Sequence, residues 1–147
     1  MMNPSSAVLA IDPGSHKCGV AVVQQDNTVR MRAIVPVEQL HDRVVAILEG
    51  DRPVAVVCGD GTGSRPILKL LTELLTERNA MLEKPSTVPL IALDEAHTSE
   101  LARARFVREN RPPLLQRLLP LSLRTPWCPY DDYVALILAE RYWQSFS

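Results

Sequence analysis

The segment 8–23 constrains the fold most, because it places a carboxylate at the end of an apolar strand. Four apolar residues precede Asp12 and a run rich in valine follows Gly19, so the segment predicts two strands of a buried hairpin joined by a Pro-Gly-Ser turn. A carboxylate in that position is costly unless it is paired or binds a cation. Alternatively, Asp12 only caps the turn through nearby backbone amides, as Asp before Pro-Gly often does. The hairpin alone favours neither role.

Length and composition limit the classes of protein to which the chain can belong. The chain has 147 residues, of which 46% are hydrophobic and 22% charged, with a formal net charge of -1. This predicts one globular domain over 1–147 with a flexible tail at 1–6. The near-neutral charge excludes a polybasic nucleic-acid coat. Three cysteines without C-x-x-C spacing favour reduced thiols, and the short polar start favours neither a signal sequence nor a membrane span, so we expect a cytoplasmic protein.

The hydrophobic pattern places strands first and helices later. Alternation predicts a third strand at 28–35, near a sheet edge, and short apolar runs predict two more at 53–59 and 88–93. Helical spacing predicts helices over 37–50, with Gly50 as the C-terminal cap, and over 64–82, 98–108 and 130–146. The order strand-strand-strand-helix-strand-helix-strand-helix-helix predicts an α/β fold with a five-stranded mixed sheet and helices on both faces.

The stretch 109–130 differs in composition from the rest of the chain. It holds five prolines, which interrupt regular structure, and together with Arg108 its arginines give a local positive charge. The arginines within it are Arg111, Arg117 and Arg124. We expect a long basic surface loop with a single helical turn near 114–119.

Acidic residues follow three of the predicted strands and open the last helix. These are Asp12, Asp60, Asp94 with Glu95, and Asp131 with Asp132. If the three strands are parallel neighbours, their C-terminal ends share one edge of the sheet. Oxygen ligands without a His or Cys cluster suit Mg²⁺ or Mn²⁺, and two such ions would promote phosphodiester hydrolysis. Each acid also has a plainer role, such as shaping a glycine-rich turn, capping a helix or complementing a helix dipole.

Three motifs, in order along nearly the whole chain, resemble the YqgF/RuvX family of Holliday-junction resolvases and pre-16S rRNA processing nucleases with the RNase H-like fold. The family motif Asp-x-Gly-x-x-Arg-x-Gly-x-Ala is matched by Asp12, Gly14, Lys17, Gly19 and Ala21. Its Asp-Glu-Arg-x-Thr-Thr/Ser-x-x-Ala is matched by Asp94, Glu95, Ala96, Thr98, Ser99 and Ala102. Its closing Asp-x-x-Ala-Ala with an aliphatic run is matched by Asp132, Tyr133, Val134, Ala135, Leu136, Ile137 and Leu138.

The resemblance implies that Asp12, Glu95 and Asp132 are the catalytic, metal-binding acids, holding two Mg²⁺ or Mn²⁺ ions in a nuclease that leaves a 5′-phosphate and a 3′-hydroxyl. Secondary candidates are Asp60, Asp94 and Asp131. Asp60 stands where relatives usually have Gly-Leu-Pro, and it would restore a carboxylate that other RNase H-like nucleases keep. The substrate implied is RNA, as in rRNA processing, or branched or single-stranded DNA.

Lys17 and Ala96 replace two arginines of the family, which removes bidentate phosphate contacts. We therefore expect the substrate phosphates to be contacted by Lys17, Thr98, Arg65 and Arg124. Trp127 or Tyr130 could stack on an unpaired base, although Trp127 could equally close the core beneath the loop. Cleavage of both strands of a symmetric junction would favour a homodimer.

Two other classes of function remain open on the sequence. The turns 12–15 and 60–63 also resemble the phosphate-gripping turns of actin-like phosphotransferases. Those enzymes hold their nucleotide between two domains, and this chain has room for one. The other class is a non-catalytic RNA-binding assembly factor that has kept the fold and lost the chemistry, against which the retained acids argue.

Overall fold

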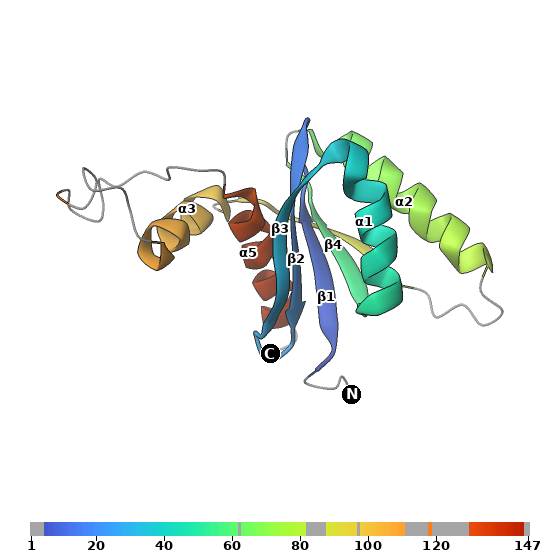
Figure 1. Ribbon diagram of the computed structural model, residues 1–147, viewed down its shortest axis with the longest axis horizontal. Helices are drawn as coiled ribbons and strands as arrows, with labels where there is room; N and C mark the ends of the chain where they lie inside the picture. The colour runs from blue at the N-terminus through green and yellow to red at the C-terminus, as the bar shows by residue number, and fades with distance from the viewer. Residues whose placement is uncertain are drawn as a thin grey trace.

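A five-stranded mixed sheet lies between two pairs of helices (Figure 1). The computed structural model describes residues 5–61, 63–81, 88–96, 98–110, 118 and 130–145. The strands are β1 (Ala7–Asp12), β2 (Lys17–Gln24), β3 (Val29–Pro36), β4 (Ala55–Gly59) and β5 (Leu90–Leu93). The helices are α1 (Val37–Gly50), α2 (Ser64–Met81), α3 (Thr98–Glu109) and α5 (Asp131–Gln144). This order confirms the predicted α/β class.

The sheet brings the C-terminal ends of three strands to one edge. The strand order is β3-β2-β1-β4-β5, in which β1, β4 and β5 are parallel and β2 and β3 run antiparallel. Ile11 on β1 is paired with Cys58 on β4, and Gly59 is paired with Leu93 on β5. The residues that follow these strands therefore leave the sheet together, as expected from the sequence. The prediction that the third strand lies at a sheet edge is also confirmed.

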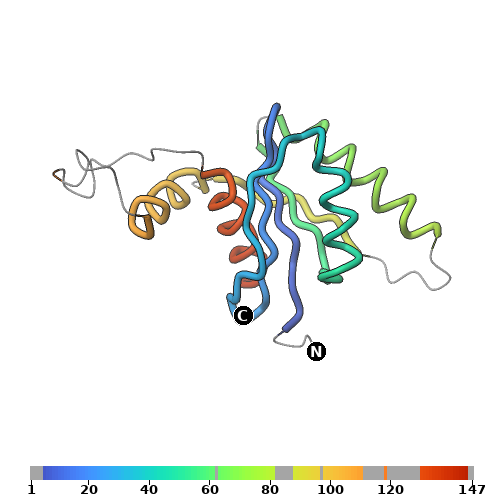
Figure 2. Tube along the Cα trace, in the orientation of Figure 1, coloured from blue at the N-terminus to red at the C-terminus, as the bar shows by residue number. Residues whose placement is uncertain are grey.

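Each face of the sheet carries its own core because side chains alternate along a strand. On β1, Val8 and Ala10 pack toward α3 and α5, while Leu9 and Ile11 pack toward α1 and α2. Figure 2 shows the two helix pairs on opposite sides of the central strands. Burial on both faces explains why β1 and β4 are almost continuously apolar. In the described part of the chain, Cys18 and Cys58 are buried free thiols.

Helix α5 lies directly on the sheet. A Cβ atom added at Gly19 on β2 would overlap the backbone carbonyl of Asp131, so the absence of a side chain lets the start of α5 approach the strand. At the other end, Trp143 Nε1 donates a hydrogen bond to the Val23 carbonyl at 2.9 Å. These two contacts bring Asp131 and Asp132 to the edge of the sheet where β1 ends.

Trp143→Phe is expected to destabilise the protein by about 1–2 kcal/mol, because the smaller aromatic ring packs less well and the buried Val23 carbonyl loses its donor. Urea denaturation measures this difference in the free energy of unfolding. An unchanged free energy of unfolding would show that the hydrogen bond does not hold α5 on the sheet.

Some predicted boundaries differ from the structure. Gly50 is the last residue of α1, and the C-terminal cap is Asp51, whose N–H donates to the Ile47 carbonyl at 2.8 Å. Asp51 has a right-handed backbone with φ of -87°, and the residue in the left-handed region is the next one, Arg52, with φ of 48°. The strand predicted from residue 53 begins at Ala55.

Parts of the basic loop predicted over 109–130 fall outside the described residues. Arg124, Trp127 and the expected turn at 114–119 lie in this group, apart from residue 118. No helix in the described segments is both long and apolar enough to cross a membrane.

Candidate active site

Two carboxyl groups predicted for the site, those of Asp12 and Glu95, face each other at the edge of the sheet. Asp12 ends β1, and Glu95 lies in the connection between β5 and α3. Burial raises the pKa of Asp12 to about 8, with further contributions from the charges of Glu95 and Asp131 and from a hydrogen bond shared with Glu95. Burial also raises the pKa of Glu95, and the charge of Asp60 adds to that effect. Below about pH 8, Asp12 therefore keeps its proton and donates it to Glu95.

Two glycines make room for the Glu95 side chain. A Cβ atom added at Gly59 or at Gly61 would overlap the Glu95 carboxylate. The Gly-Asp-Gly sequence after β4 is therefore a cradle for this carboxylate as well as a turn. The main chain of Glu95 is held from the other side, since its carbonyl accepts hydrogen bonds from the Thr98 hydroxyl at 2.7 Å and from the Thr98 N–H at 3.0 Å.

The Glu95 carboxylate has a spare ligand position. Its Oε1 atom is buried and receives no hydrogen bond from a fixed donor within the described residues. Once Asp12 has released the proton that it donates to Glu95, a buried anionic oxygen without a donor is costly, and a cation would satisfy it. Asp12 and Glu95 supply only oxygen ligands, and Mg²⁺ is commonly bound through one or two carboxylates plus water. The pair therefore fits a hard divalent cation.

The two acids that open α5 have different partners. Asp131 forms an ion pair with Lys17 at 3.7 Å, and its charge acts on Asp12. Asp132 is 16% exposed and pairs with Arg32 Nε at 2.9 Å, while the Arg32 guanidinium lies 4.1 Å from the centre of the Tyr133 ring. Asp131 therefore lies close enough to act on Asp12, whereas the Asp132 side chain pairs with a residue of β3.

The other predicted residues have varied positions. Asp60 is the central residue of the cradle and is exposed, and the exposed Asp94 accepts a hydrogen bond from the Ala96 N–H at 2.8 Å. Thr98 is buried, with its hydroxyl committed to the Glu95 carbonyl. Arg65 is exposed in the first turn of α2. Arg124 lies outside the described residues.

Within the described ranges no group of three or more His, Cys, Asp or Glu side chains is close enough to hold a metal ion. The structure brings together two of the three predicted ligands, Asp12 and Glu95. The assignment of Asp132 as the third ligand, and of a second ion, stays a prediction.

Sequence reasoning did not single out two arginines that shape the site. Arg32 holds Asp132, and Arg141 on α5 donates to the backbone carbonyls on both sides of Glu95. Arg32 lies in an alternating strand, where a polar residue indicates only an exposed face. Arg141 lies in the last turn of a helix, where a cation normally complements the helix dipole. Neither position carries a sequence signal of function.

The strand order and the placement of the helices define a fold class. The five-stranded mixed sheet with helices on both faces matches the RNase H-like fold found in RuvC-type resolvases. This confirms the fold predicted from the sequence. No protein-family profile matches the chain, and no curated protein is significantly similar to it in sequence.

Several solved structures are similar to the chain in fold. Thermus thermophilus RuvC in complex with a Holliday junction is similar to the chain with a TM-score of 0.63 and 19% identity, over 96% of this chain and 95% of that one. The yeast mitochondrial Holliday junction resolvase Ydc2 has a TM-score of 0.56 and 16% identity, over 99% and 81%. The fowlpox virus resolvase with junction DNA has a TM-score of 0.54 and 14% identity, over 95% and 98%. At these identities the likeness is one of fold.

Gly59→Ala is expected to push the flexible Glu95 side chain away from Asp12, because the new methyl group would occupy the position of the carboxylate. The pKa of Asp12 should then fall, since the interactions with Glu95 that raise it are weakened. Carboxyl-carbon NMR titration measures this shift. Gly50→Ala is the matched control, because a Cβ atom there meets no neighbouring atom. An unchanged Asp12 titration in Gly59→Ala would contradict the cradle.

Proposed function

We propose that the chain is a divalent-metal-dependent nuclease that hydrolyses phosphodiester bonds in branched DNA. The observation that carries this proposal is the half-buried Asp12–Glu95 pair at the C-terminal edge of three parallel strands. Ligands bind at this edge in open α/β sheets. The fold is shared with resolvases whose structures contain Holliday junction DNA, which supports branched DNA as the substrate class.

Asp12 and Glu95 would hold the ion, with Mg²⁺ or Mn²⁺ as the expected metal. When bound, such an ion lowers the pKa of a water molecule and stabilises charge on the leaving oxygen. Asp12 must release its proton before it can act as a ligand, so metal binding and proton release are coupled. Metal affinity should therefore rise steeply with pH up to about 8, the pKa of Asp12 in the free protein.

The cations near the edge suit contact with a phosphate backbone. Lys17 is 46% exposed, and its ion pair with Asp131 is long, at 3.7 Å. A phosphate group could attract this ammonium without breaking a buried interaction. Arg65 adds an exposed positive charge at the start of α2. We assign these two side chains to substrate binding, and Asp132 to metal binding once its pair with Arg32 opens.

A cleavage assay tests the proposal directly. The substrates are a labelled four-way DNA junction, a linear duplex of the same sequence, single-stranded DNA and single-stranded RNA, each with Mg²⁺, Mn²⁺ or EDTA. We expect metal-dependent cleavage that is strongest on the junction, with 5′-phosphate products. Preferential cleavage of RNA would redirect the proposal to the rRNA processing implied by the sequence resemblance. No cleavage of any substrate with either metal would refute the nuclease.

Symmetric cleavage of a junction needs two active sites, and a closed pair of identical subunits supplies them with matching symmetry. We therefore propose that the chain acts as a homodimer on junction DNA. Light scattering with and without the junction measures the stoichiometry, and one subunit per junction during paired cleavage would contradict the dimer.

A further inference from the structure

Three consecutive backbone carbonyls around Glu95 each accept a hydrogen bond from a side chain. Arg141 Nη1 donates to the Asp94 carbonyl at 2.9 Å, and Arg141 Nη2 donates to the Ala96 carbonyl at 2.6 Å. The Thr98 hydroxyl donates to the carbonyl of Glu95 itself at 2.7 Å. The connection that carries the carboxylate is therefore held at three successive residues, two of them by one guanidinium group.

The two bonds from Arg141 fix an orientation as well as a position. Its donors belong to a planar group of rigid geometry, so both carbonyls must keep their spacing for the two hydrogen bonds to persist. Arg141 in turn belongs to the last turn of α5, which the hydrogen bond from Trp143 to Val23 attaches to the sheet. The segment from Asp94 to Ala96 is thus connected to β2 through α5, independently of α3.

We infer that Arg141 is a positioning residue, and this inference rests on the proposed nuclease function. Its guanidinium holds the segment 94–96 in place. The Glu95 carboxylate therefore stays beside Asp12 in the Gly59–Gly61 cradle. Without Arg141, the carbonyls of Asp94 and Ala96 lose their donors and the segment relaxes. Changes to groups that orient a metal ligand typically lower metal affinity or activity about 10–100-fold. Arg141 does not touch the ligand oxygens in this structure, so its effect reaches them through the backbone.

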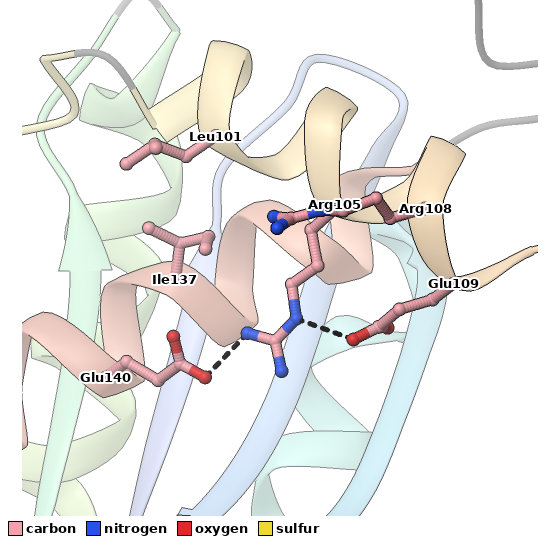
Figure 3. Close-up of a pocket in the computed structure, with 6 residues that line it drawn as sticks. All are labelled: Leu101, Arg105, Arg108, Glu109, Ile137 and Glu140. Carbon is pink, nitrogen blue, oxygen red and sulfur yellow. Dashed lines mark hydrogen bonds and ion pairs between the residues drawn. The ribbon is translucent and has the colours of Figure 1, made fainter. Parts of the chain in front are cut away.

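A second arginine, on α3, also contacts α5 and provides a matched control. Arg105 on α3 contacts Glu140 on α5 at 2.6 Å and Glu109 at 3.0 Å, as the dashed lines in Figure 3 show. It lines a cavity of about 400 Å³ between α3 and α5, together with Leu101, Arg108, Glu109, Ile137 and Glu140. None of these residues belongs to the segment 94–96. Loss of Arg105 removes a bond between α3 and α5 without releasing the carbonyls beside Glu95.

The experiment compares Arg141→Gln with Arg105→Gln in the full chain. Isothermal titration with Mn²⁺ measures metal affinity in the absence of substrate, and amide hydrogen exchange measures the protection of the Ala96 and Thr98 N–H groups in the metal-free protein. Both amides donate within the connection, to Asp94 Oδ1 and to the Glu95 carbonyl. We expect Arg141→Gln to weaken Mn²⁺ binding about 10-fold or more and to accelerate exchange at both amides. Arg105→Gln should change neither property more than about twofold.

Steady-state kinetics on the four-way junction separate positioning from substrate contact. In Arg141→Gln, with Mn²⁺ saturating, we expect kcat to fall and KM for the junction to stay unchanged. Arg141→Lys should recover part of the loss, because an ammonium can reach a carbonyl but lacks the planar pair of donors. If Arg141→Gln does not fold, the same measurements are compared between Arg141→Lys and Arg105→Gln.

The outcomes separate this inference from the proposed function. If the wild-type protein neither binds Mn²⁺ nor cleaves nucleic acid, the nuclease proposal fails, and hydrogen exchange alone decides whether Arg141 orders the segment 94–96. If the wild-type protein does both, and the Arg141 and Arg105 variants lose affinity equally or not at all, Arg141 only helps to pack α5 against the rest of the fold and the positioning role is overturned.

Discussion

Asp12→Asn is expected to lower the rate of junction cleavage by about 10³-fold or more, because it removes the charge of the most deeply placed carboxylate of the pair. The asparagine side chain has nearly the same shape, and its amide can still donate to Glu95, so the Glu95 carboxylate should stay in the cradle. The loss should therefore be one of metal binding and chemistry. Single-turnover cleavage at saturating Mn²⁺, with Mn²⁺ affinity measured separately, tests both parts.

Asp42→Asn provides the control, since Asp42 is an exposed acid of α1 whose carboxylate lies 3.3 Å from Nδ1 of the neighbouring His41. It should cleave at the wild-type rate. Equal cleavage by Asp12→Asn and the wild-type protein would remove Asp12 from the site. Asp131→Asn and Asp132→Asn, compared in the same assay, identify which acid of α5 acts as the third ligand.

The fold could be predicted from local patterns because its strands and helices obey simple rules. The apolar runs of β1 and β4 indicate strands buried on both faces, and the helical spacing of Leu40, Val44 and Ile47 indicates α1. The prediction was wrong at Gly50, because the helix includes this residue and the left-handed residue after the cap is Arg52, with φ of 48°. End positions depend on one or two hydrogen bonds, so local patterns locate them less exactly than they locate the elements.

The meeting of Asp12 and Glu95 could be predicted as well, since both follow strands whose parallel pairing brings their ends to one edge. The roles of Asp131 and Asp132 could not. Neighbouring residues of a helix point about 100° apart, and the direction of each depends on where α5 sits over the sheet. Asp131 forms an ion pair with Lys17 on β2, and Asp132 forms one with Arg32 on β3. These contacts arise only in the folded chain.

The same substitution that removes activity should stabilise the metal-free protein. The pKa of Asp12 is raised from 3.8 to about 8 on folding, mainly by burial. Below pH 4 the carboxyl is protonated in both the folded and the unfolded chain. Between pH 4 and pH 8 the unfolded chain releases the proton while the folded chain retains it, so the free energy of unfolding falls as pH rises. Above pH 8 both forms are ionised and the penalty stays constant.

Asp12→Asn lacks this titration, so its advantage over the wild-type protein should be small at pH 4 and largest at pH 8. Each unit of pKa shift corresponds to about 1.4 kcal/mol. The raised pKa belongs to the coupled Asp12–Glu95 pair and not to Asp12 alone, so the full shift is not assigned to this one residue. We therefore expect the variant to be more stable by about 3 kcal/mol at pH 8. Urea denaturation in EDTA across this range measures the difference, and a difference independent of pH would contradict the raised pKa of Asp12. Adding Mn²⁺ should reverse the order, since only the wild-type pair gains stability from a bound cation.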